Sequence, residues 1–202
     1  MGFADPDKRN GLHDDLCAYL ASKDASLTLV REVGKRINWL GKRSCDRQIV
    51  ASGGSKWCSF EVECSRFKNP TVKLEHALVK GHGQYATTVG FFDVYLEGIL
   101  LLGDCPDHGE KNLELVDIIV EVKAGKVSPS DLLRQINLYR SIPTSRANIK
   151  TQWVVFTGFR YGADDAALLE REGIHVFCAG AKFEAWQRAR SETQAADGGT
   201  EI

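Results

Sequence analysis

The second half of the chain alternates short apolar runs with helical segments, and this alternation constrains the fold more than any other feature of the sequence. A helix is expected from a Ser128 N-cap, followed by proline at its first position, to just before Pro143. Strand–helix–strand alternation requires crossover connections, which place strands parallel. The remaining elements expected in this half are strands at 118–123, 152–156 and 174–178, a helix at 164–172 ended by Gly173, and a last helix containing Phe183 and Trp186.

The first half predicts two amphipathic helices followed by antiparallel strands. Leucines at helical spacing indicate a helix over 12–20, and a second helix is expected from a Ser26 N-cap to Gly41. Residues 97–117 are acidic and contain glycine, so we expect a hairpin or loop insertion there. The predicted fold class is α/β, with a mixed central β-sheet flanked by helices on both faces. Runs rich in Val, Phe, Thr and Tyr predict strands at 57–64, 72–79 and 87–96.

Length and charge bound the class of protein. The chain has 202 residues, which fits a flexible N-terminus at 1–10, a single domain at 11–190 and a disordered acidic tail at 191–202. The 26 basic and 27 acidic residues nearly cancel, which excludes a protein that coats nucleic acid by bulk charge. We find no signal sequence and no apolar run of membrane-spanning length, so we expect a cytoplasmic protein without membrane contact.

The cysteines predict neither a disulfide framework nor a metal site. The chain has 6 of them, without a Cys-x-x-Cys pair. The nearest approach to a zinc motif is Cys105 followed by His108, which has no second half at ligand spacing. We therefore expect reduced cysteines and no structural zinc.

Three charged residues interrupt strands that are otherwise apolar. Asp93 lies in the run at 87–96, and Glu121 and Lys123 lie two positions apart in the run at 118–123. Because side chains alternate along a strand, Glu121 and Lys123 are expected on one face. Alternative interpretations are a solvated ion pair at a sheet edge and a turn aspartate. Burying such charges is costly unless they are paired or bind a metal.

Metal-assisted phosphodiester hydrolysis uses this combination of residues. Two carboxylates on neighbouring strands can hold Mg²⁺, which keeps several of its waters and takes few protein ligands. The metal lowers the pKa of a bound water and neutralises the phosphate. A lysine beside it can orient the water or stabilise the transition state.

Three motifs in chain order resemble the PD-(D/E)xK nuclease superfamily, in particular its RecB-type branch. They are Gly90-Phe91-Phe92-Asp93 on an expected strand, Glu121-Val122-Lys123 on the next strand, and Gln135 to Tyr139 and Arg140 on the expected helix. The proline of the nominal first motif is absent, because Phe92 precedes Asp93. The resemblance implies a restriction-endonuclease-like fold from about residue 12 to 180.

The resemblance also implies roles for individual residues. Asp93 and Glu121 would hold Mg²⁺, for which Mn²⁺ substitutes, Lys123 would be the catalytic lysine, and Gln135 would flank the site with Tyr139. An acid on an early helix is a further expected metal ligand, with Glu32 favoured and Asp15 as the alternative. The iron–sulfur cluster of some relatives is not expected, because Cys178 is the single late cysteine. Hydrolysis would leave a 5′-phosphate and a 3′-hydroxyl.

Basic residues gather in two segments that flank the expected site, at 31–47 and 123–150. Such segments are typical of backbone contacts to DNA, although ordinary solvated helix faces look the same. The residues expected to contact nucleic acid are Tyr139, Arg140, Arg134, Lys126, Lys35 and Arg36.

The sequence therefore predicts a Mg²⁺-dependent deoxyribonuclease. Specificity is expected from DNA shape, a homodimer or a partner protein, because no separate recognition domain is visible. Two alternatives stay open: a catalytically idle nuclease fold that serves as a nucleic-acid-binding or assembly module, and a nuclease that acts on RNA.

Overall fold

A computed structural model describes residues 11–37, 41–51, 54–63, 71–81, 83–104, 111–142 and 149–197. Its centre is a seven-stranded sheet in the order β1-β2-β4-β5-β6-β7, with β3 paired to β4. Pairings among β1 to β5 are antiparallel, whereas β5–β6 and β6–β7 are parallel. The predicted α/β class with a mixed sheet is confirmed, including parallel strands in the second half. The expectation for 1–10 lies outside the described residues.

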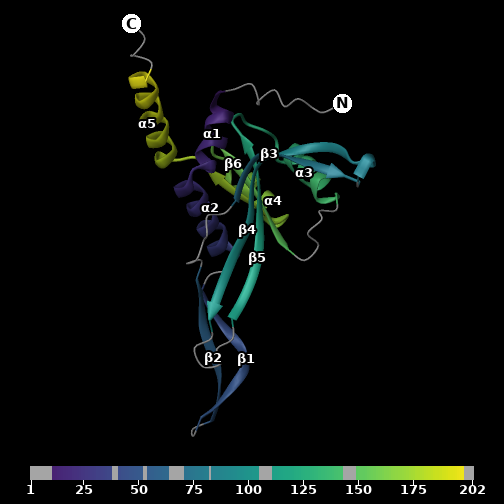
Figure 1. Cartoon of the computed structure of the whole chain (residues 1–202), viewed down its shortest axis with the longest axis vertical. Helices are drawn as coiled ribbons and strands as arrows, with labels where there is room; N and C mark the ends of the chain where they lie inside the picture. The colour runs from purple at the N-terminus through teal and green to yellow at the C-terminus, as the bar shows by residue number, and fades with distance from the viewer. Residues whose placement is uncertain are drawn as a thin grey trace.

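The elements follow one another along the chain as Figure 1 shows. Their bounds are α1 Gly11–Ala21, α2 Lys23–Arg36, β1 Gly41–Ala51, β2 Gly54–Glu63, β3 Thr71–Lys80, the 3₁₀ turn η2 Gly83–Tyr85, β4 Thr87–Asp104, β5 Lys111–Lys123, α3 Pro129–Arg140, β6 Lys150–Thr157, α4 Ala163–Arg171, β7 Ile174–Cys178 and α5 Ala181–Asp197.

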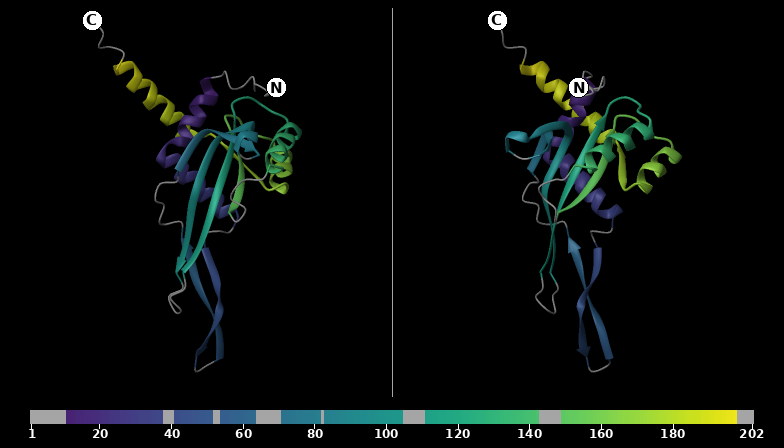
Figure 2. Two further views of the ribbon diagram at one scale, coloured as in Figure 1. Left: turned by 45° about the vertical axis from the view of Figure 1, so that its right-hand side comes forward. Right: turned by 90° about the vertical axis from the view of Figure 1, so that its right-hand side faces the viewer.

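Helices cover both faces of the sheet, as predicted (Figure 2). On one face, residues of α1, α2 and α5 share a hydrophobic core with alternate residues of β5, including Val120 and Val122. On the other face, α3 packs on Ile119 through Tyr139 and on Val155 of β6 through Leu132 and Ile136, beside α4. This alternation along β5 places Glu121 on the face that α3 covers.

The strands β4 and β5 separate at the point where the candidate site lies. Their pairing runs from Asp104 opposite Lys111 to Val94 opposite Val120. Before Val94, β4 pairs with β3, and beyond Val120, β5 continues beside β6. The sheet is therefore forked between Asp93 on one strand and residues 121–123 on the other.

The described parts of the acidic stretch at 97–117 form the two antiparallel strands of a hairpin, one of the two outcomes expected for it. Both strands extend into it, β4 as far as Asp104 and β5 from Lys111. Asp117, expected within the insertion, is instead buried in β5 and accepts a hydrogen bond from the Tyr95 hydroxyl at 2.6 Å. β1 and β2 form a further ribbon that pairs with the distal part of β4 and extends from the body (Figure 1).

Three predicted boundaries are wrong. The second helix begins at Lys23 with Ser22 at its N-cap, so Ser26 lies buried within the helix, where its hydroxyl donates to the Lys23 carbonyl. The same helix ends at Arg36, and Gly41, its predicted end, is the first residue of β1. The disordered tail was placed from residue 191, but α5 continues to Asp197, because the glutamine and alanines of this stretch have high helix propensity. Within the described residues, no helix has both the length and the apolar character to cross a membrane.

Candidate active site

Asp93 lies at the fork and links the two separating strands. The residue is 1 % exposed, and its Oδ2 accepts a hydrogen bond from the backbone N–H of Val122 at 2.9 Å. This N–H lies beyond the last paired position of β5 with β4, so the carboxylate takes the place of a strand partner. Asp93 is therefore fixed against β5 from the neighbouring strand.

Glu121 and Lys123 meet on one face of β5, as the period of the strand predicts. Lys123 Nζ lies 3.0 Å from Glu121 Oε1, and the two residues are 2 % and 4 % exposed, respectively. They are therefore not a solvated pair at a sheet edge. A buried ion pair gains little stability over an apolar pair of the same size, because both charges lose their hydration. Packing alone does not account for this pair.

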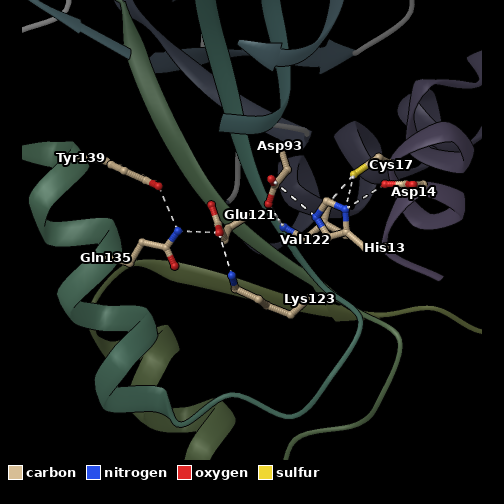
Figure 3. Close-up of polar contacts among 9 residues, drawn as sticks. All are labelled: His13, Asp14, Cys17, Asp93, Glu121, Val122, Lys123, Gln135 and Tyr139. Carbon is tan, nitrogen blue, oxygen red and sulfur yellow. Dashed lines mark hydrogen bonds and ion pairs between the residues drawn. The ribbon is translucent and has the colours of Figure 1, made fainter. Parts of the chain in front are cut away.

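Helix α3 supplies the side chains that orient Glu121. Gln135 Nε2 donates to Glu121 Oε1 at 2.7 Å and to the Tyr139 hydroxyl oxygen at 2.9 Å (Figure 3). The helix begins at the predicted N-cap, where Ser128 Oγ accepts from the Asp131 N–H. The expected placement of Gln135 and Tyr139 beside Glu121 is thus present in the structure.

His13 of α1 is the site residue that the sequence analysis missed. It is 3 % exposed, and its Nε2 lies 3.6 Å from Asp93 Oδ1, on the side of Asp93 away from α3 (Figure 3). Cys17, one helical turn later, places its Sγ 3.9 Å from the same imidazole. A single histidine on an amphipathic helix carries no distinctive spacing, and the resemblance implies a carboxylate, not an imidazole, on an early helix.

The environment shifts the pKa values of two site residues in the same direction. Burial, and then the negative charge of Asp93, raises the pKa of Glu121 from 4.5 to about 7, although Lys123 and Gln135 oppose this rise. The contact with Asp93, and then that with Cys17, raises the pKa of His13 from 6.5 to about 10. His13 is therefore an imidazolium at neutral pH and balances part of the charge of Asp93.

The structure does not bring either candidate early acid to this cluster. Glu32 is on the solvent side of α2, with 47 % of its side chain exposed and its Oε1 2.7 Å from Lys35 Nζ. Asp15 points toward α5, where it accepts hydrogen bonds from Gln187 and Arg190. The expectation that Glu32 completes the metal site is therefore corrected, because its helix position directs it to solvent, and α1 reaches Asp93 through His13.

The basic residues expected to contact nucleic acid have different surroundings. Arg140 donates to the carbonyls of Glu172 and Gly173 and lies over the Trp153 ring, so it joins α3 to the end of α4. The remaining four are exposed: Arg36 pairs with Glu170, Lys35 with Glu32, and Arg134 with Asp131, while Lys126 lies in the loop between β5 and α3.

The two carboxylates fit a hard divalent cation. Asp93 and Glu121 offer oxygen ligands from adjoining strands, and the negative charge of Asp93 contributes to the raised pKa of Glu121. In the part of the chain that the structure describes, no three His, Cys, Asp or Glu side chains form a ready-made metal cage. Mg²⁺ commonly uses one or two carboxylates and completes its shell with water and substrate phosphate. The donor set therefore suits Mg²⁺ or Mn²⁺.

Together, Asp93, Glu121, Lys123, Gln135 and Tyr139 form one connected cluster on β4, β5 and α3, and His13 adjoins it from α1. Comparisons with protein-family models, curated proteins and solved structures find no match for this chain.

Proposed function

We propose that this protein is a metal-dependent nuclease that hydrolyses DNA phosphodiester bonds at the fork between β4 and β5. The observation that carries the proposal is the convergence of Asp93 and Glu121, from two strands, with the Lys123 ammonium 3.0 Å from one glutamate oxygen. Burying two acids and a lysine is costly in a purely structural core. Hydrolytic chemistry at phosphorus uses just these groups.

The residues of the chain prepare the site in separate ways. The Val122 N–H fixes Oδ2 of Asp93, and Gln135 fixes Oε1 of Glu121, so both carboxylates are held before substrate arrives. These two carboxylates would hold a divalent cation, which would supply charge neutralisation at the phosphate and lower the pKa of a water. Lys123, beside Glu121, orients that water and stabilises the negative charge that develops on the phosphate oxygens. Water attacks phosphorus and gives up a proton to solvent, the bond from phosphorus to the 3′-oxygen breaks, and that oxygen takes up a proton from solvent. A 5′-phosphate and a 3′-hydroxyl remain.

One observation favours the second candidate function, an idle nuclease fold that binds nucleic acid. Asp93, Glu121 and Lys123 are all less than 5 % exposed, and the His13 imidazolium already contacts Asp93. With both cations present, the two negative charges are balanced without a metal. In such a module the cluster would serve the fold alone, and substrate would bind without being cut.

A cleavage assay separates the two candidates. The protein is incubated with linear, supercoiled and branched DNA and with RNA, in Mg²⁺, Mn²⁺ or EDTA. We expect DNA cleavage with either metal and none in EDTA. The variants Lys123→Met and Asp93→Asn keep the shape of each side chain, and we expect both to lose cleavage while their Tm confirms that they fold. Cleavage of RNA alone supports the RNA alternative.

Two outcomes contradict the nuclease. The first is binding of DNA without cleavage by the wild type in either metal, which supports the idle module. The second is a Lys123→Met variant that cleaves as well as the wild type. Glu32→Gln is the matched control, because this acid is half exposed and pairs only with Lys35 among the contacts described above.

A further inference from the structure

The hairpin of β3 and β4 carries most of the large apolar side chains that are exposed in the described residues. Seven large apolar side chains are exposed in the described residues, and five of them lie between positions 74 and 91. Tyr85 at the turn is 78 % exposed and Phe91 on β4 is 46 % exposed. A concentration of exposed apolar side chains is typical of a surface that contacts a partner or a ligand. The other three are Leu74, Val79 and Val89.

The hairpin leaves the body beside α3 (Figure 1). Over Thr87 to Phe92, β4 has β3 as its strand neighbour, and a two-stranded ribbon alone is marginally stable in water. Its inner face is anchored, because Leu78 and Phe92 pack in a cluster with Tyr139 of α3. The inner face thus supplies the stability, and the exposed residues are available for contact.

The edge of β3 is not suited to pairing with another strand. Glu75 has a φ of 47°, in the left-handed region, and it interrupts the pairing between Leu74 opposite Val94 and His76 opposite Phe92. An irregular, charged edge disfavours addition of a further strand. Contacts to this hairpin are therefore expected through side chains.

The exposed aromatic residues lie next to the candidate active site. Phe91 precedes Asp93 by two residues on the same strand, so their Cα atoms are about 7 Å apart. Lys80 at the end of β3 and Lys126, three positions after the end of β5, are exposed cations. A nucleic-acid strand whose phosphate reaches Asp93 and Glu121 would therefore pass close to Phe91.

The exposed aromatic rings favour one form of nucleic acid over another. Bases in a duplex are stacked on one another and present only their edges, whereas an unpaired base can stack on an exposed ring. Stacking on Tyr or Phe tolerates any base, so binding of this kind does not require a particular base sequence. Aliphatic neighbours such as Val79 and Val89 extend the apolar surface beside the rings.

We propose that the β3–β4 hairpin binds unpaired bases through Tyr85 and Phe91, and that the substrate is single-stranded DNA or DNA with an unpaired segment at the point of cleavage. This inference rests on the proposed nuclease function for its choice of partner, and it concerns a surface outside the carboxylate cluster.

Binding is tested by fluorescence anisotropy in EDTA, so that the result does not depend on cleavage. The probes are a fluorescein-labelled oligothymidylate and a blunt duplex of the same length. We expect the double variant Tyr85→Ala/Phe91→Ala to bind the single strand about tenfold more weakly or worse, with duplex binding changed less than about twofold. The aromatic exchange Tyr85→Phe/Phe91→Tyr should retain wild-type binding.

Leu115→Ala is the matched control, because Leu115 is 47 % exposed but lies outside the hairpin. The proposal is overturned if the wild type prefers the duplex or binds neither probe, or if the double alanine variant keeps its affinity for the single strand. It is also overturned if the wild type forms an oligomer that the double alanine variant lacks, since the surface would then join copies of the chain. Aromatic-dependent binding without cleavage in Mg²⁺ supports the hairpin and contradicts the nuclease, so the two failures are distinguishable.

Discussion

Replacing Glu121 with glutamine should stabilise the protein at alkaline pH. The pKa of Glu121 in the folded protein is about 7, against an ordinary 4.5, so the folded state holds the proton more tightly than the unfolded chain does. The stability due to the protonated carboxyl is complete below pH 4.5 and is lost as the pH rises through 7. One pKa unit corresponds to about 1.4 kcal/mol, which gives a loss of about 3 kcal/mol over this range.

Glutamine keeps the shape and the Oε1 acceptor for Gln135 and Lys123, but it has no charge to bury. At about pH 8 the free energy of unfolding of Glu121→Gln should therefore exceed that of the wild type by about 3 kcal/mol. For a chain of this size the gain raises Tm by about 6–12 °C. Near pH 4.5, where wild-type Glu121 is protonated when folded, the difference should nearly vanish.

The assay is thermal and urea unfolding of the wild type, Glu121→Gln and Glu32→Gln at both pH values. The same change at the half-exposed Glu32 should have little effect at either pH. If the site binds Mg²⁺, adding it at the higher pH should raise the Tm of the wild type and not that of Glu121→Gln. A Glu121→Gln variant that is less stable than the wild type at the higher pH, or equally stabilised at both, would refute the reasoning.

Three further predictions concern neighbouring features. Gly90→Ala would place a methyl group 2.9 Å from Tyr139 Cε1, closer than the roughly 3.5–4.0 Å of carbon contacts. Urea unfolding should therefore show that the free energy of unfolding falls by about 1–3 kcal/mol. The same substitution should cost less in a Tyr139→Ala background, and an equal cost there would contradict the clash. Ser128→Ala removes the N-cap of α3 and should cost about 1 kcal/mol with an unchanged m-value, whereas no change would show that the cap is dispensable. The stability contributed by the His13 imidazolium is complete below pH 6.5 and is lost as the pH rises through about 10, so the free energy of unfolding of the wild type should fall over this range. In His13→Gln this fall should be smaller. An equally steep fall in the variant would exclude His13 as its source.

Periodicity predicts most of the fold because local patterns determine where its elements form. The buried residues of α3, Leu132, Ile136 and Tyr139, follow the predicted stripe, and β5 alternates between two cores as its sequence alternates. The boundaries were less predictable, since the serine at the N-cap of α2, Ser22, makes no side-chain capping hydrogen bond, and the serine that was expected there, Ser26, is buried inside the helix.

The carboxylates and the lysine of the candidate site were predictable because charge in an apolar strand is conspicuous. His13 was not, since its role depends on where α1 lies against the sheet and not on its neighbours in the sequence. For the same reason Glu32 was misplaced: both residues occupy helices with similar apolar stripes, and only the tertiary arrangement shows which helix reaches the fork.

Because Asp93 accepts a hydrogen bond from the Val122 N–H, folding alone limits which residues can replace Asp93, even in a chain without catalytic activity. Replacing Asp93 with alanine would leave a buried backbone donor without its acceptor, at a cost of about 1–3 kcal/mol. Selection for folding alone would therefore retain an oxygen acceptor at this position. Both asparagine and aspartate provide this acceptor, and only aspartate also carries a negative charge. The charge of Asp93, and not its acceptor oxygen, is therefore the feature that selection for catalysis would add.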